Sequence, residues 1–132
     1  MDMKLELVPM PVTDIDRAKA FYVDGVGFHE DVDVRPADGV RIVQLTPPAS
    51  GCSIVLSTGL AALSAMAPGT INGLHLVVAD IDQAREELAG RGVDVSAVDD
   101  SAGGGVKYAS FNDPDGNTLV LQEMSWRTGD AY

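Results

Sequence analysis

The chain has few basic residues and a single cysteine. Lys and Arg together number 9 against 20 Asp and Glu, which gives a formal net charge of −11 at pH 7. A surface this acidic should repel nucleic acid and anionic lipid, so we expect neither as a partner. Cys52 has no second cysteine to pair with, which excludes an internal disulfide and favours a cytoplasmic location.

Long apolar runs are also missing. No stretch approaches the roughly 18 apolar residues of a membrane span, so no membrane partner is expected. The first residues, MDMKLELVP, lack the basic patch and long apolar run of a signal peptide. Apolar residues still make up 45% of the 132 residues, which is enough for a core. We therefore expect one domain over residues 1–132.

The stretch FNDPDGNTLVLQE, residues 111–123, has the pattern of a strand, a tight turn and a second strand. Asp113 suits the first position of a type I turn, Pro114 the second and Gly116 the fourth. Apolar and mixed positions then alternate from residue 118 to residue 122. This strand is therefore expected to have one apolar face for the core and one mixed face for chemistry.

Residues 1–57 predict a β-α-β-β-β module. Its helix begins at Asp14, which is a suitable cap, and ends at Gly25 and Gly27. Pro9 and Pro11 cannot donate hydrogen bonds to a ladder, so the first strand belongs at a sheet edge or has these positions facing outward. The predicted strands are 4–12, 28–34, 40–45 and 52–57.

The same pattern recurs 66 residues later in the chain. Asp80 and Ile81 repeat Asp14 and Ile15, and the glycines that end the first helix recur as a second pair. A repeat in this order predicts a duplicated module at about 71–125, joined to the first by a linker at 58–70. The predicted elements of the second module are a helix at 81–90 and strands at 72–79, 94–98, 105–111 and 117–123.

The expected fold class is therefore α+β, with two tandem β-α-β-β-β modules whose curled mixed sheets surround a concave cleft. Side chains with the parity of the apolar positions belong to the core, and those of opposite parity line the cleft. The cleft residues expected on this basis are Leu7, Pro9, Ser53, Val55, Gly73, His75, Val77, Thr118, Val120 and Gln122.

Three stretches together resemble the vicinal oxygen chelate superfamily, which includes glyoxalase I, extradiol dioxygenases, fosfomycin-resistance enzymes and bleomycin-resistance proteins. They are PVTDIDRAKAFYVDGVGF at 11–28, HLVVADIDQAREELAGRGV at 75–93, and FNDPDGNTLVLQE at 111–123. The resemblance implies a glyoxalase-like fold of paired modules, a homodimer, and ligands bound in concave clefts.

The resemblance also implies four positions for metal ligands, two in each module. In this chain they are Leu7, Val55, Gly73 and Val120, none of which has a side-chain donor. A divalent metal needs several convergent N, O or S donors. We therefore expect no cofactor and no metal at the usual place.

Two functions follow as hypotheses. The first is a binder of a small organic molecule, with drug sequestration as one form, because the expected lining is mostly apolar with a few polar groups. The second is an enzyme of the glyoxalase or dioxygenase kind, with a shifted metal site or a metal-free mechanism in which His75 is the candidate catalytic group.

Each polar candidate also has a structural interpretation. His75 can be a hydrogen-bonded structural residue, and Gln122 can be solvated at a strand end. The sequence does not determine which face of the second strand His29 lies on. Trp126 follows the last strand, where it can cover a cavity mouth, form a dimer contact or belong to a loose tail.

Overall fold

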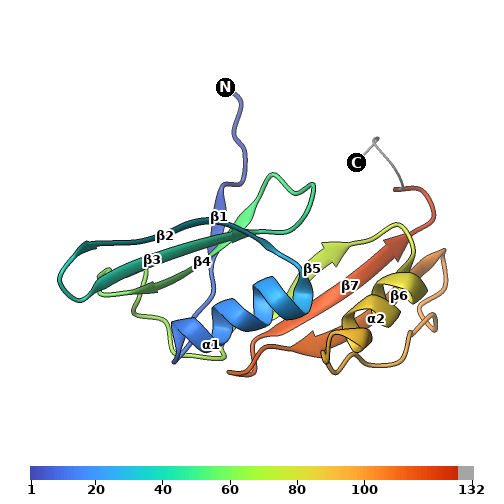
Figure 1. The fold of residues 1–132 in the computed structure, drawn as a ribbon. Coiled ribbons are helices and arrows are strands. Elements are labelled where there is room, and N and C mark those ends of the chain that lie inside the picture. The colour runs from blue at the N-terminus through green and yellow to red at the C-terminus, as the bar shows by residue number, and fades with distance from the viewer. Residues whose placement is uncertain (128–132) are drawn as a thin grey trace. The chain divides into compact units, whose positions relative to one another are not determined.

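The computed structural model describes residues 1–127, and the chain divides into two compact units. Unit one comprises Met1–Ile71 together with Asp113–Asn117, and unit two comprises Asn72–Asn112 together with the chain from Thr118 onward. The remainder of the expected domain, residues 128–132, lies outside the described part. The elements of both units are drawn in Figure 1.

Unit one contains a four-stranded mixed sheet, called sheet A, with the strand order β1-β4-β3-β2. β1 runs parallel to β4, whereas β2 and β3 are antiparallel to their neighbours. β1 is an edge strand, which is one of the two arrangements that Pro9 and Pro11 allow, and it covers only Leu7–Pro9 of the predicted strand 4–12. The elements are β1 Leu7–Pro9, α1 Ile15–Ala20, the π-helical turn η1 Phe21–Val26, β2 His29–Ala37, β3 Val40–Thr46 and β4 Ser53–Thr58.

The first helix begins and ends where the sequence predicts. Asp14 is its N-cap, and the carboxylate accepts a hydrogen bond from the backbone nitrogen of Arg17 at 3.0 Å. The helix continues through η1 to Gly27, whose φ of 96° is a left-handed conformation that favours glycine. α1 contacts β4, and the ring of Tyr22 lies 5.5 Å from that of Phe28 in the buried core of this unit.

Unit two contains a three-stranded mixed sheet, called sheet B, with the order β5-β7-β6. Its helix repeats the first one, because Asp80 caps it by accepting a hydrogen bond from the backbone nitrogen of Gln83 at 3.0 Å. The helix contacts both β6 and β7. The elements are β5 Asn72–Val77, α2 Ile81–Gly90, β6 Val106–Asn112 and β7 Thr118–Met124.

The strand predicted at 94–98 is wrong, and sheet B therefore has three strands rather than four. Val93 and Val95 are buried as in a strand, and the nitrogen of Ser96 donates to the carbonyl of Ser110. The return bond goes to a side chain instead, since the Ser110 nitrogen donates to the Ser96 hydroxyl at 2.9 Å. The Ser96 carbonyl is taken by Arg85 of α2 at 2.7 Å. These two bonds replace ladder bonds, so the segment follows β6 without becoming a strand.

The predicted α+β class with two mixed sheets and few helices is confirmed. Within residues 1–127, we find no helix with the length and apolar character needed to cross a membrane.

Candidate functional site

Six of the expected cleft residues belong to unit two, where they lie on β5 and β7. The strand register pairs His75 with Val120 and Val77 with Gln122. These side chains have the opposite parity to Leu121, which is buried. Five of the six share the side of sheet B that faces away from the core, namely His75, Val77, Thr118, Val120 and Gln122. Gly73 lies at the register irregularity between Asn72 and Leu74.

Two further residues from β6, missed by the sequence analysis, complete this surface. Tyr108 pairs with Gln122 and Ser110 pairs with Val120. The Tyr108 ring meets that of His75 edge to face, at 6.2 Å between centroids and 86° between planes. The alternation of side chains along the predicted strand 105–111 could have identified both residues. We call this surface the open face of sheet B and define it as His75, Val77, Tyr108, Ser110, Val120 and Gln122.

His75 is the exposed member of the open face, and the other members are half-buried. Its Nδ1 lies 2.5 Å from the carbonyl oxygen of Gly73. A carbonyl oxygen can only accept, so Nδ1 carries the proton in this contact. When the ring is neutral, Nε2 therefore keeps a lone pair on an exposed surface. That atom can accept a hydrogen bond from a ligand, or a proton from a substrate.

The charged side chains of the sheet B strands lie on the other side of the sheet. Lys107 and Glu123 have the parity of the core, and Lys107 Nζ lies 3.6 Å from Glu123 Oε2. Glu123 Oε1 also accepts a hydrogen bond from the backbone nitrogen of Ile81 at 3.1 Å, which stabilises the start of α2. The six residues of the open face therefore include no Asp, Glu, Lys or Arg, and an acidic residue at its border, Asp99, pairs with Tyr108 in an isolated antiparallel bridge.

The other four expected residues lie in unit one. Leu7 is paired with Ser53, and Pro9 with Val55, across β1 and β4. Leu7 and Pro9 are half-buried, whereas Ser53 and Val55 are 5% and 2% exposed. Within unit one, Ser53 and Val55 thus present almost no surface to solvent.

The 58–70 segment explains part of this burial. The Ser64 hydroxyl lies 2.9 Å from that of Ser57 on β4, and it also accepts a hydrogen bond from the Leu60 nitrogen at 2.9 Å. Val55 lies with Leu63 of this segment around a cavity of about 20 Å³. A space of that size holds about one water molecule and no organic ligand.

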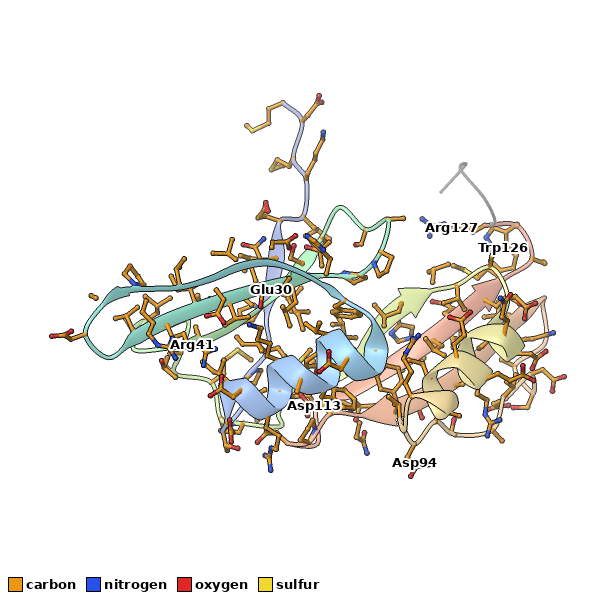
Figure 2. All side chains as sticks on the ribbon, viewed as in Figure 1. Glu30, Arg41, Asp94, Asp113, Trp126 and Arg127 are labelled. Carbon is orange, nitrogen blue, oxygen red and sulfur yellow. The ribbon has the colours of Figure 1, made fainter. Side chains whose placement is uncertain are left out.

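A larger cavity of about 750 Å³ lies elsewhere in unit one, beside the β2–β3 hairpin and the start of α1. None of the ten expected residues lines it. Arg41, labelled in Figure 2, lies on its wall. Its guanidinium donates two hydrogen bonds to Asp33 at 3.0 and 2.9 Å and one to Asp16 at 2.7 Å. Hydrogen bonds from Arg41 and then Lys19 hold the pKa of Asp33 well below its ordinary value. These charges neutralise each other and support the hairpin.

The 113–117 segment forms the predicted turn, with the Gly116 nitrogen donating to the Asp113 carbonyl at 3.0 Å, and it belongs to unit one. The Asp113 carboxylate, labelled in Figure 2, is buried and accepts four hydrogen bonds. Tyr22 Oη and Asn117 Nδ2 donate to one oxygen at 2.8 Å each. The backbone nitrogens of Asp115 and Asn117 donate to the other at 2.9 Å each. This carboxylate therefore organises the turn and has no oxygen left for a substrate.

Burial keeps Tyr22 in the donating form that this arrangement requires. Burial first, and the neighbouring Asp113 carboxylate second, raise the pKa of Tyr22 above its ordinary value. The phenol therefore stays protonated and acts as a hydrogen-bond donor to Asp113.

The positions implied for a metal do not fit one. Leu7, Val55 and Val120 carry hydrocarbon side chains, and Gly73 carries none. Gly73 also has a φ of 83°, so a ligating side chain at this position would be strained. The described residues contain no group of three or more His, Cys, Asp or Glu side chains that could hold a metal ion.

Two remaining candidates lie at the surface. His29 is exposed, with Nε2 3.8 Å from Asp31. Trp126 follows β7 and is 62% exposed (Figure 2).

Comparison with known proteins gives a consistent group of relatives. Residues 4–121 match the family model described as the Glyoxalase/Bleomycin resistance protein/Dioxygenase superfamily. No match is found among curated protein sequences.

Three solved structures are similar over nearly the whole chain. TnmS3, an antibiotic binding protein from Streptomyces sp. CB03234, is 34% identical, with 94% of this chain and 98% of that chain covered and a TM-score of 0.79. A glyoxalase/bleomycin resistance protein from the same organism is 36% identical, with coverages of 89% and 98% and a TM-score of 0.73. A superfamily member from Sphaerobacter thermophilus DSM 20745 is 30% identical, with coverages of 92% and 98% and a TM-score of 0.77.

Proposed function

The chain belongs to the Glyoxalase/Bleomycin resistance protein/Dioxygenase superfamily, and from this premise we propose that it binds a small organic molecule on the open face of sheet B without using a metal. Drug sequestration is the form of this function that we favour. It is supported by a 34% identical relative described as an antibiotic binding protein. It is supported independently by the absence of side-chain donors at the four positions where the family's metal ligands are implied.

The observation that carries the proposal is the composition of the open face. His75 and Tyr108 offer two aromatic rings in an edge-to-face pair, and Val120 contributes apolar surface. Gln122 and Ser110 add neutral hydrogen-bonding groups. A surface of aromatic, apolar and uncharged polar groups matches an uncharged ligand with aromatic character.

A binding experiment with a matched control tests this proposal. Isothermal titration against a panel of uncharged aromatic antibiotics and cationic antibiotics should give saturable binding with the uncharged class. Tyr108→Ala should weaken that binding at least about tenfold, since an aromatic contact and its buried area are lost. Lys107→Ala, a neighbour whose side chain lies on the other side of sheet B, should leave the affinity unchanged. Equal losses in the two variants would contradict a site on the open face.

An enzymatic role is the second candidate, and the geometry of His75 favours it. The proton on Nδ1 is held by the Gly73 carbonyl, which leaves Nε2 as a base on the exposed side. Elemental analysis of protein purified without chelator distinguishes a shifted metal site from a metal-free mechanism. A stoichiometric metal that is lost in His75→Ala would favour a shifted metal site over both binding and a metal-free reaction.

We also propose a homodimer that works in the cytoplasm. β1 is an edge strand whose outer side is unpaired in sheet A, and such edges favour association. A single unpaired cysteine, Cys52, suits a reducing compartment. Light scattering at micromolar concentration should give the mass of two chains, and the mass of one chain would contradict the dimer.

A further inference from the structure

The residues before β1 form an unusual apolar pattern. Met1, Met3 and Leu5 are 108%, 85% and 78% exposed, and they alternate with Asp2 and Lys4. The chain here runs beyond the end of β1 without joining a sheet (Figure 1). Alternation with a period of two is the pattern of a strand with one apolar face. The segment thus has a strand's sequence without a strand's partner in the described structure.

The backbone of β1 shows which of its sides is available for such a partner. The Glu6 carbonyl accepts from the Ser53 nitrogen, and the Met10 nitrogen donates to the Val55 carbonyl. Even-numbered residues therefore face β4, and by alternation the odd-numbered residues face the free edge. Pro9 is one of these and has no N–H to donate. New pairing along this edge is consequently favoured before Pro9, toward Met1.

The opposite edge of sheet A is poorly suited to the same role. β2 is interrupted by register irregularities between Glu30 and Val32 and between Val34 and Ala37. It also carries the acidic side chains of Asp31 and Asp33. Bulges and charges of this kind protect an edge strand from association.

We propose that Met1–Leu5 pairs as an antiparallel strand with the same residues of a second copy, about a twofold axis at Met3. This inference rests on the proposed homodimer and not on ligand binding. In this register Met3 lies opposite itself and Met1 lies opposite Leu5 of the other copy. Asp2 lies opposite Lys4 in both directions, so each dimer contains two opposite-charge pairs.

Other registers match less well. An axis at Lys4 places the two Lys4 side chains opposite each other and Asp2 opposite Glu6, which gives only like-charge contacts among the charged pairs. An axis at Leu5 joins Lys4 to Glu6 but places Asp2 opposite Val8. Of these three registers, only the axis at Met3 matches every apolar residue with an apolar residue and every charge with its opposite.

The hydrogen-bonding direction agrees with this register. When the alternation of β1 is continued into Met1–Leu5, the odd-numbered residues face the free edge, and an axis at Met3 makes Met3–Met3 and Met1–Leu5 the hydrogen-bonded pairs. Asp2 and Lys4 then form the non-hydrogen-bonded pairs, in which side chains approach most closely. Charge and backbone direction therefore select the same arrangement.

Charge reversal tests the register with the full chain. Asp2→Lys and Lys4→Asp should each raise the dimer dissociation constant at least about fivefold in sedimentation velocity, because two attractive pairs become repulsive. An equimolar mixture of these two variants, and separately the Asp2→Lys/Lys4→Asp double variant, should recover the wild-type value to within about twofold. If Lys4→Asp weakens the dimer while Asp2→Lys does not, the axis at Met3 is wrong.

Cross-linking supplies a second, independent readout. In a Cys52→Ser background, Met3→Cys should oxidise to a covalent dimer, since a hydrogen-bonded antiparallel pair holds its Cα atoms about 5.5 Å apart. Leu5→Cys in the same background should cross-link poorly, and efficient cross-linking at Leu5 would overturn the proposed axis. A wild-type dimer that is indifferent to all these changes would refute the arm pairing and leave the homodimer standing. A wild-type monomer would refute both.

Discussion

At the scale of single residues, the strongest local arrangement is the buried Asp113 carboxylate. Its four hydrogen bonds come from Tyr22, Asn117 and two backbone nitrogens, so a chemical group that could act on a substrate is used instead to hold a turn. The exposed His75 has the opposite character, with one ring nitrogen fixed and the other available. Burial and partner count therefore separate structural from functional candidates more reliably than residue type does.

Removing one donor to Asp113 should be costly. Tyr22→Phe leaves a buried carboxylate oxygen with one fewer partner, and we expect the free energy of unfolding to fall by about 1–3 kcal/mol. Urea denaturation followed by circular dichroism measures this loss. Tyr108→Phe removes a hydroxyl from the half-buried open face of sheet B and should change stability by less than about 0.5 kcal/mol. Equal effects of the two changes would contradict the role assigned to Tyr22.

Another prediction for a single residue follows from the backbone conformation of Gly116. Gly116 has a φ of 90°, and no atom lies within 4 Å of a Cβ added there. Gly116→Val should therefore destabilise the fold by about 1–3 kcal/mol through backbone strain alone. Gly51 is also free of neighbours within 4 Å but lacks a positive φ, so Gly51→Val should be nearly neutral. The melting temperatures of the two variants give the comparison, and a similar value for both would exclude strain at Gly116.

At the scale of elements, the sequence predicts the helices better than the strands. Each helix begins at an aspartate that hydrogen-bonds three residues ahead, a signal contained in the local sequence. The 94–98 segment shows the limit of local signals. Val93 and Val95 alternate and are buried as in a strand, but the ladder bonds of the segment are replaced by a contact with Arg85 from α2 and by the hydroxyl of Ser96. Only the folded unit brings these groups together.

The start of α2 provides a prediction at this scale. Asp80 accepts from the Gln83 nitrogen and Glu123 from the Ile81 nitrogen, so two carboxylates bind two helix N–H groups that have no partner within the helix. Asp80→Ala should lower the free energy of unfolding by about 0.5–2 kcal/mol. Asp82→Ala, in the first turn of α2, loses only the favourable charge near the helix N-terminus and should cost less. Chemical denaturation of both variants provides the test, and a larger loss for Asp82 would contradict the capping role.

The candidate site could be predicted only in part, because local sequence signals do not show which distant segments cover a side chain. Strand parity placed His75, Val77, Val120 and Gln122 on one face, and the strand register agrees with that grouping. Parity alone did not reveal that Val55 would be buried with Leu63 of the 58–70 segment. A periodic pattern predicts which way a side chain points, whereas what covers that side chain depends on segments distant in sequence.

At the scale of the whole molecule, charge is unevenly distributed. The chain carries −11 overall, with a calculated isoelectric point near 4.2, while the open face of sheet B has no formally charged side chain. Self-repulsion at this net charge opposes folding and is screened by salt, so the melting temperature should rise as salt is added. Binding of an uncharged ligand to an uncharged face involves no such repulsion.

Salt should therefore separate stability from function. Between about 20 and 300 mM NaCl, where screening lengths fall severalfold, the dissociation constant of an uncharged aromatic ligand should change by less than about twofold. The melting temperature should rise over the same range. Isothermal titration and differential scanning calorimetry on the same samples measure the two quantities. A loss of affinity of about tenfold or more would show that charged groups of the protein contribute to binding, and the open face of sheet B would then no longer explain it.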